Sequence, residues 1–358
     1  MTQKPFEEIA KRLRGERVML IGGAGFIGHN FSLKLAEIGV KVMVVDNLMV
    51  NSLIDNVYIE REEVQRQMYQ NFLLDRFEMM RNAGVQLRNS DARILLDLTR
   101  AFEDFQPTKV VHLSAISSAV IARENPGLCF DLQLVTLRNA IELARTSHDQ
   151  VNQVMFLSSS TVYGDFYGDS VDENTRPHPK GIYANAKYMG ERLLRTYNQQ
   201  HGIGTTIIRP SALYGERCIS GRVSQKFIEN ALIGKPLLLE GGGGGRLDFT
   251  YIADLVDGMV RALALHEGKD YSSTFNLTFG NARTIADLAD VVQSVMPGVK
   301  IEERPKAEDK PERGTLSTLR AENELGFQAL WNLEDGYKRY CEWYVEQWHR
   351  AQRDVERK

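Results

Sequence analysis

Short runs of apolar residues recur along the first two hundred positions and alternate with stretches of helical periodicity. The runs are Val18–Ile21, Val42–Val45, Val85–Arg88, Val110–Leu113, Val154–Ser158 and Thr205–Arg209. The first two are apolar at every position rather than at every second one, which is typical of strands buried on both faces. Such strands, separated by helices, predict an α/β fold in which a doubly wound parallel sheet is covered on both sides.

The pattern changes in two places. Residues 51–84 are longer than an ordinary crossover, and their apolar residues recur at helical spacing, which predicts one or two extra helices packed on their own domain. A lid or a dimer surface is the alternative for this helical insertion. After Gly215 turns dominate, so we divide the chain into a sheet domain, 1–215, and a smaller irregular α/β lobe, 216–358, partly interleaved with it.

Composition narrows the range of partners. A formal net charge of −3 gives no basic footprint for nucleic acid or an anionic membrane surface. The amino terminus is charged and lacks the apolar core of a secretion signal, and no apolar run approaches about 18 residues, so a cytoplasmic protein is expected. Cys129, Cys218 and Cys341 are widely spaced, which favours free thiols over disulfides and predicts no metal site.

A glycine-rich turn follows the first expected strand directly. It reads Gly22-Gly23-Ala24-Gly25-Phe26-Ile27-Gly28 and leads into a helical pattern through Leu35. Glycines at 22, 25 and 28 permit a tight turn, close approach of the backbone to a pyrophosphate, and close packing of helix on strand. The helix amino terminus would then face the phosphates with the positive end of its dipole. Strand, turn and helix stand in the order that a Rossmann dinucleotide-binding domain requires.

Asp46 closes the second expected strand. Its carboxylate is placed to accept hydrogen bonds from the hydroxyls of an adenosine ribose, and it would repel a 2′-phosphate, so NAD is favoured over NADP. The alternative is a turn-forming aspartate before Asn47.

A tyrosine and a lysine four residues apart carry the candidate chemistry. Tyr183 and Lys187 form the only Tyr-x-x-x-Lys in the chain, and they follow a serine cluster, Ser158–Ser160, at the end of the fifth strand. On one helical face, the ammonium would lower the pKa of the phenol from its usual ~10 toward neutrality and make Tyr183 a usable base. The alternatives are a chance pair and, for the serines, a polar strand cap.

Taken together, these motifs resemble the extended short-chain dehydrogenase/reductase family of NAD-dependent nucleotide-sugar epimerases and dehydratases. The resemblance runs from about Arg17 to Tyr344. Its motifs are GGAGFIG at 22–28, VVDN at 44–47, SDAR at 90–93, VVHLSA at 110–115, SSSTVYG at 158–164, YANAK at 183–187, RPSALYG at 209–215, RLDFTYIAD at 246–254, FNLTFG at 275–280 and ELGF at 324–327.

The resemblance implies roles for particular residues. Ser159, Tyr183 and Lys187 would be catalytic. The NAD contacts would be Gly22, Gly25, Phe26, Ile27, Gly28, Asp46, Asn47, Asp91, Ala92, Leu113, Ser114, Ala115, Tyr183, Lys187 and Pro210. A nucleotide-diphosphate sugar would be the substrate, held by Ser118, Ser159, Ser160, Thr161, Arg246 and Arg313. A surface ion pair is the alternative for each arginine. A homodimer through helices of the larger lobe is also implied.

Departures from the family pattern discriminate among reactions. Dehydratases usually carry an Asp-Glu or Ser-Glu pair after the catalytic hydroxyl, whereas this chain has Ser160 and Thr161, and the glutamate of the decarboxylases is also missing. A hydroxyl is not a competent acid or base at neutral pH. The sequence therefore favours a 4-epimerase acting through a transient 4-keto sugar. A C4 dehydrogenase, a 4,6-dehydratase and a non-catalytic NAD-binding sensor remain as alternatives. Ala212 and Gln133 replace asparagines common in the family.

Overall fold

A seven-stranded parallel sheet forms the centre of the computed structural model, which describes residues 6–50, 52–58, 61–116, 119–147, 150–265, 271–306 and 311–357. The strand order is β12-β7-β5-β4-β1-β2-β3. The bounds are β1 Arg17–Ile21, β2 Lys41–Asp46, β3 Gln86–Asn89, β4 Lys109–His112, β5 Gln153–Leu157, β7 Gly204–Arg209 and β12 Ser272–Asn276. The six predicted strands and the doubly wound fold are therefore confirmed. The sequence pattern did not predict β12, which pairs with β7 at the edge of the sheet.

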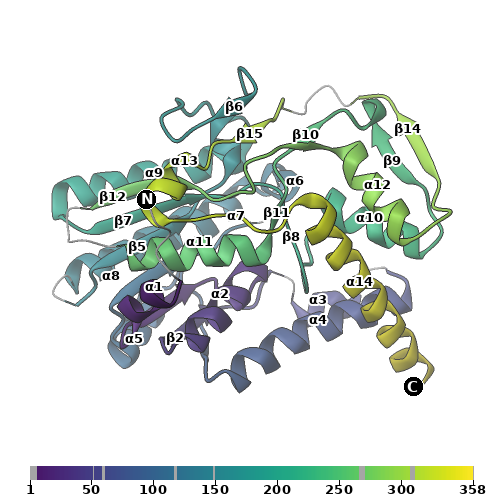
Figure 1. Cartoon of the computed structure of the whole chain (residues 1–358). Helices are drawn as coiled ribbons and strands as arrows, with labels where there is room; N and C mark the ends of the chain where they lie inside the picture. The colour runs from purple at the N-terminus through teal and green to yellow at the C-terminus, as the bar shows by residue number, and fades with distance from the viewer. Residues whose placement is uncertain are drawn as a thin grey trace.

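Both faces of the sheet are buried, as the uninterrupted apolar runs predict. Val18 and Leu20 of β1 belong to the cluster under α1, α2 and α11, whereas Met19 and Ile21 belong to the cluster under α5, α8 and α9. Figure 1 shows these helices around the sheet. They span Phe6–Leu13 (α1), Phe26–Glu37 (α2), Leu95–Phe105 (α5), Thr136–Thr146 (α8), Gly181–His201 (α9) and Ile252–Ala264 (α11).

The remaining elements are mostly short or lie after residue 215, whereas the long helix α4 lies before it. Four two-stranded pairs join β6 (Ser170–Val171) to β15 (Thr315–Leu316), β8 (Leu213–Tyr214) to β11 (Thr250–Tyr251), β9 (Leu237–Glu240) to β14 (Ile301–Arg304), and β10 (Arg246–Leu247) to β13 (Arg283–Thr284). The helices are α3 (Leu53–Tyr58), α4 (Glu63–Asn82), α6 (Ala119–Glu124), α7 (Pro126–Phe130), α10 (Val223–Leu232), α12 (Ile285–Val295), α13 (Leu319–Leu325) and α14 (Leu333–Glu356). A π-helical turn, η1 (Asp131–Val135), and two 3₁₀ turns, η2 (Ser160–Tyr163) and η3 (Gly241–Gly243), complete them.

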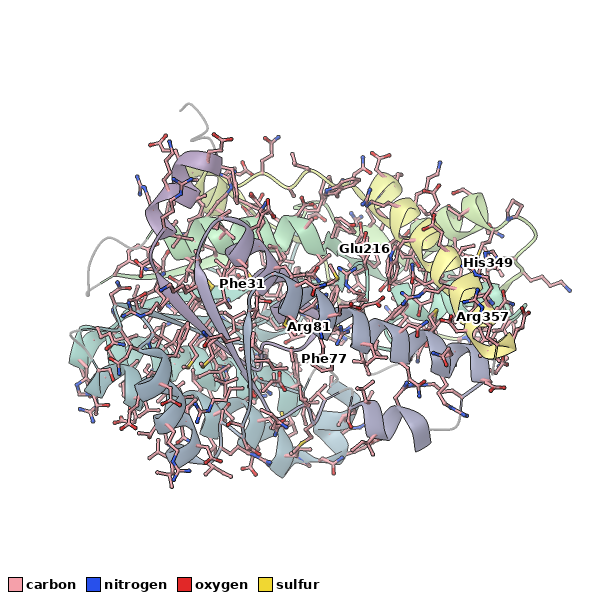
Figure 2. The ribbon with its side chains drawn as sticks, turned by 90° about the horizontal axis from the view of Figure 1, so that it is seen from below. Phe31, Phe77, Arg81, Glu216, His349 and Arg357 are labelled. Atoms are coloured by element: carbon pink, nitrogen blue, oxygen red, sulfur yellow. The ribbon has the colours of Figure 1, made fainter. Side chains whose placement is uncertain are left out.

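Helix α4 of the 51–84 segment packs along α14 of the same chain. Tyr69 of α4 donates a hydrogen bond to the buried Glu229 of α10, and Arg350 of α14 donates to Asp75 of α4 at 2.7 Å. Figure 2 shows the same arrangement from below, with Phe77 and Arg81 on α4 and His349 and Arg357 on α14. The 51–84 segment is thus covered by the other lobe of its own chain.

Two further features concern the three cysteines and the apolar length of the helices. Cys129, Cys218 and Cys341 are free and buried, as predicted. No helix of the described residues is long and apolar enough to cross a membrane.

Candidate active site

The glycine turn lies where the strand order changes direction, between the carboxyl ends of β1 and β4. Gly22 has φ +76°, and a Cβ there would stand 2.6 Å from backbone atoms of Ser114. A Cβ on Gly28 would stand 2.3 Å from the carbonyl oxygen of Gly23, so α2 can pack on the turn only without a side chain. A Cβ on Gly25 would meet no atom of the described residues closer than the carbonyl oxygen of Gly22 at 3.9 Å, which leaves open space above the middle of the turn. Ligands of open α/β sheets bind at such a crevice.

The first turn of α2 suits a diphosphate. Gly25 is the N-cap residue, and no side chain of the described residues caps the helix. The amides of this turn, at the positive end of the helix dipole, therefore face the open space left by Gly25. These residues fit the pyrophosphate of a dinucleotide.

Asp46 holds the glycine turn from the end of β2. Its Oδ2 accepts from the amide of Ala24 at 2.9 Å and its Oδ1 accepts from the amide of Leu48 at 2.8 Å. Burial raises the pKa of this carboxyl above its usual value. Each carboxylate oxygen can accept a second bond, so ribose hydroxyls can still be bound. The predicted turn role and the predicted ribose role are compatible.

The residues predicted for the adenine side are gathered after β3. Asp91 accepts two hydrogen bonds from Nε and one from Nη2 of Arg93, at 2.6 to 3.1 Å, and one from Nδ2 of Asn47 at 3.1 Å. Bonding to Arg93 lowers the pKa of Asp91 to about 2, so the carboxylate is charged at neutral pH. Ala92 is buried, and its carbonyl accepts from Asn139.

Other predicted cofactor residues surround the same edge of the sheet. Leu113 continues β4 and donates to Ile21 at 2.8 Å, and Ser114 lies against Gly22. Pro210 follows β7, and its carbonyl accepts from Ser160 at 2.9 Å. The structure thus places the carboxyl ends of β1, β4 and β7 together. Ser118 lies outside the described residues.

Ser159, Tyr183 and Lys187 lie together beneath this edge. Ser159 follows β5, and its side chain lies close enough to the phenol of Tyr183, in the first turn of α9, to lower the pKa of that phenol. Lys187 is 2% exposed, and its Nζ donates to the carbonyl of Leu157 at 2.7 Å. Its Nζ lies 5.9 Å from the centre of the Tyr183 ring.

The predicted lowering of the phenol pKa by Lys187 is wrong for this structure. Burial raises the pKa of Tyr183 above its usual value, and the two influences that lower it come from Arg222 and Ser159. Burial also lowers the pKa of Lys187 to about 7, which weakens its charge near neutral pH. The physical reason is desolvation, which disfavours the charged form of both groups and which residue spacing does not reveal.

The two predicted substrate arginines differ in setting. Arg313 is partly buried over the ring of Phe166, and its Nη1 donates to the carbonyl of Ser160 at 3.0 Å, next to the candidate catalytic residue Ser159. Burial lowers the pKa of Arg313 to about 10. Arg246 is exposed, and its Nη2 donates to the carbonyl of Ala282 at 2.8 Å.

Sequence reasoning missed two features of the site. Arg222, at the N-cap of α10, is the cation with the largest influence on Tyr183, yet it comes from the other lobe and no local pattern indicates it. Glu191 and Arg209 form a buried ion pair beneath Ser158, whose Oγ donates to Glu191 at 2.6 Å. No local spacing indicates this pair, because Arg209 lies on β7, 18 residues after Glu191.

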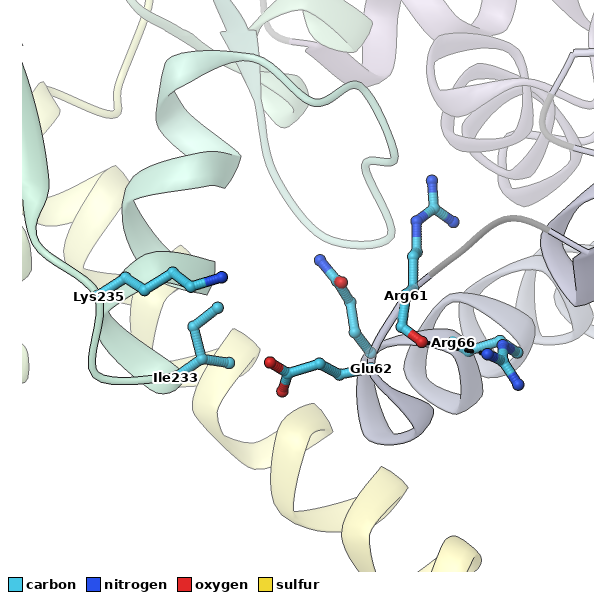
Figure 3. Close-up of a pocket in the computed structure, with 6 residues that line it drawn as sticks. Arg61, Glu62, Arg66, Ile233 and Lys235 are labelled. Carbon is cyan, nitrogen blue, oxygen red and sulfur yellow. Dashed lines mark hydrogen bonds between the residues drawn. The ribbon is translucent and has the colours of Figure 1, made fainter.

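A separate pocket of 540 Å³ lies between the start of α4 and the loop that follows α10 (Figure 3). Glu62 and Lys235 point toward one another across it, while Arg61 and Arg66 point away. None of the predicted site residues lines this pocket. It therefore belongs to the junction between α4 and the carboxyl-terminal lobe, and the active site is built elsewhere.

Replacement of Gly28 tests the glycine turn. In Gly28→Ala, the added Cβ must displace the turn or α2, so the dissociation constant for NAD should rise at least about tenfold, or about 1.4 kcal/mol. Titration calorimetry measures it. Gly127→Ala, whose Cβ would meet nothing within 4 Å, is the control and should bind NAD normally. Equal affinities of the two variants would contradict the assigned turn.

Comparison with known proteins agrees with this geometry. A model of the family described as "NAD dependent epimerase/dehydratase family" matches residues 18–278. UDP-glucuronic acid decarboxylase 2 of Arabidopsis thaliana is 30% identical over 331 residues, covering 90% of this chain and 67% of that protein. UDP-glucuronate 4-epimerase 2 of the same plant is 27% identical over 350 residues, covering 92% of this chain and 76% of that protein. A structure of Thermus thermophilus UDP-glucose 4-epimerase in complex with NAD has a TM-score of 0.77 at 26% identity, covering 92% and 99% of the two chains.

The family match covers the sheet, the glycine turn, Asp46 and all three candidate catalytic residues. Among the described residues, no three His, Cys, Asp or Glu side chains are grouped so as to hold a metal ion. The chain belongs to the NAD-dependent epimerase/dehydratase family and is an NAD-dependent enzyme of the extended short-chain dehydrogenase/reductase type.

Proposed function

We propose that this enzyme is a nucleotide-sugar 4-epimerase that acts through a transient 4-keto sugar. One observation carries the proposal. Ser159 lies close enough to the phenol of Tyr183 to lower its pKa, beside the buried Lys187, and the two residues that follow the serine carry hydroxyls rather than carboxylates. This arrangement can move one proton to and from a ring hydroxyl, and it offers no second acid or base for eliminating water.

In the proposed reaction, NAD supplies an acceptor that takes a hydride from C4 of the sugar and returns it. Tyr183 in its phenolate form, which Arg222 and Ser159 favour against the effect of burial, takes the proton of the C4 hydroxyl as the C4–H bond breaks, so the carbon becomes a ketone. Ser159 hydrogen-bonds the same oxygen and orients it toward Tyr183. Once the ketone has turned over, Tyr183 returns the proton as hydride reaches the opposite face of C4. The net result is inversion at C4 with no change of mass.

The neighbours of Ser159 argue against the family's other reactions. Ser160 is buried, with its carbonyl held by Arg313, and Oγ1 of Thr161 is buried without a hydrogen-bond partner among the described residues. Neither hydroxyl ionises near neutral pH. A C4 dehydrogenase would use the same three catalytic residues and differ only in releasing the ketone. A non-catalytic NAD sensor has no need of the Tyr183–Lys187 pair.

Arg246 and Arg313 are proposed to bind the diphosphate of the substrate. Guanidinium groups bind phosphate oxygens through paired hydrogen bonds, and Arg313 already lies beside Ser160. Arg246→Ala should raise KM for the nucleotide sugar about tenfold, because Arg246 is exposed and only one of two cations is lost. Steady-state kinetics measures it. The control is Arg304→Ala on β14, an exposed arginine paired with Glu302, which should leave KM unchanged.

Incubation with UDP-, GDP-, CDP- and dTDP-sugars, read by mass spectrometry and proton NMR, tests the reaction. An epimerase gives a product of unchanged mass with an inverted proton at C4. A product lighter by two hydrogens would instead establish a dehydrogenase, one lighter by water a dehydratase, and one lighter by carbon dioxide a decarboxylase. Full NAD binding with no product from any sugar would support the sensor.

Two further features belong to the proposal. We propose a homodimer formed through helices of the sheet domain and a cytoplasmic location. Sedimentation analysis of the purified chain checks the first, since a monomer at micromolar concentration would contradict it.

A further inference from the structure

A chain of hydrogen bonds links the first turn of α2 to an arginine of the other lobe. His29 is fully buried; its Nδ1 lies 3.0 Å from the carbonyl oxygen of Gly25, and its Nε2 lies 3.0 Å from Nε of Arg217. A guanidinium nitrogen can only donate, so Nε2 of His29 accepts and Nδ1 carries the proton given to Gly25. Nη2 of Arg217 also donates to Asn30 at 3.3 Å. Arg217 thereby fixes the ring of His29, and His29 fixes the N-cap of α2.

Arg217 is itself held in an uncommon conformation. Its φ is +62°, a left-handed value that few residues other than glycine adopt. Its carbonyl accepts a hydrogen bond from Arg76 of α4, which is 1% exposed and whose Nε has no partner among the described residues. Such conformations persist where the surroundings impose them, and they cluster at functional sites. Three separate parts of the chain meet here: the glycine turn, the 51–84 segment and the start of the second lobe.

The charges at this junction suit an anion near the glycine turn. Burial, together with the nearby charges of Arg76 and Arg217, holds the pKa of His29 well below its usual value, so the ring is neutral. Both guanidiniums lie near the first turn of α2. The negative charge of Asp46, at the end of β2, raises the pKa of Arg76 against the effect of burial. Arg76 and Arg217 thus place two guanidiniums near the positive end of the helix dipole, with the carboxylates of Asp46, Asp75 and Glu216 also close to them.

We propose that Arg217 is a cofactor-positioning residue, which fixes the glycine turn through His29 so that it receives the pyrophosphate of NAD, while Arg76 holds Arg217 in place. The proposal rests on the NAD site and not on the epimerase reaction. Neither arginine lies in the glycine motif, so this part of the cofactor site comes from the 51–84 segment and from the second lobe.

Binding measurements on the full chain test the proposal. In Arg217→Gln, dissociation constants for NAD and for ADP should rise about tenfold, whereas binding of adenosine should be unchanged because it has no phosphate. Arg217→Lys should lose as much affinity for NAD and ADP as Arg217→Gln, since an ammonium cannot hydrogen-bond His29 and Asn30 with the geometry of a guanidinium. The control is Arg350→Gln, which removes another arginine between α4 and the second lobe without touching α2 and should bind all three ligands normally.

Several results would overturn the proposal. Normal NAD affinity in Arg217→Gln, equal losses for adenosine and ADP, full rescue by lysine, or an equal loss in Arg350→Gln would each do so. If Arg217→Gln does not fold, His29→Leu breaks the same link from the other end. Normal ADP binding by a folded His29→Leu would then be the contrary outcome. Failure of the epimerase assay would leave these binding results unaffected.

Discussion

Tyr183→Phe is expected to lower turnover by about 10²- to 10⁴-fold, the usual contribution of a general acid–base group. The ring and its packing beside Lys187 are kept, and only the phenolic oxygen close to Ser159 is lost. The measurement is the rate of C4 inversion at saturating nucleotide sugar.

The control for this prediction lies on the same helix. Tyr188→Phe removes a hydroxyl from α9 at a partly buried position that packs beside Val162 rather than at the site, and turnover should change less than about twofold. NAD affinity should be normal in both variants. If Tyr183→Phe bound NAD fully and still turned over at the normal rate, the catalytic assignment would be wrong.

Arg209→Met is expected to lower the free energy of unfolding by about 3–5 kcal/mol, because it leaves a buried carboxylate without its cation. Arg209 and Glu191 are 1% and 0% exposed, and two hydrogen bonds of 2.8 and 2.6 Å join them. Arg209 also donates to Tyr163 at 2.9 Å. Urea unfolding followed by circular dichroism measures the change.

The same carboxylate offers a matched control. Arg195 lies 3.5 Å from Glu191 but is 40% exposed, so Arg195→Met should cost less than about 1 kcal/mol. A similar small loss in both variants would show that burial of the Arg209–Glu191 pair contributes nothing beyond a surface pair. Because Glu191 also accepts from Ser158, next to the proposed catalytic serine Ser159, the Arg209 variant should also lose activity beyond its loss of stability.

Local pattern predicted most of the sheet and the cofactor turn. A strand buried on both faces must be apolar throughout, so β1 and β2 could be predicted from their residues alone. The role of Gly22 and Gly28 in the turn could be predicted because the turn leaves no space for a side chain at either position. The polar edge strand β12, with the sequence Ser-Ser-Thr-Phe-Asn, lacks that signal and was missed. Its assignment depends on pairing with β7, far away in the sequence.

The sequence by itself determined the class of fold and the NAD cofactor, and it predicted Ser159, Tyr183 and Lys187 as the catalytic residues, because each inference rests on residues close together along the chain. Only the tertiary structure decided the ionisation of Tyr183 and Lys187, the approach of Arg222 to the phenol and the contact of Arg217 with His29. Desolvation and charge act through space. Their strength is therefore set by which distant segments the fold brings into contact.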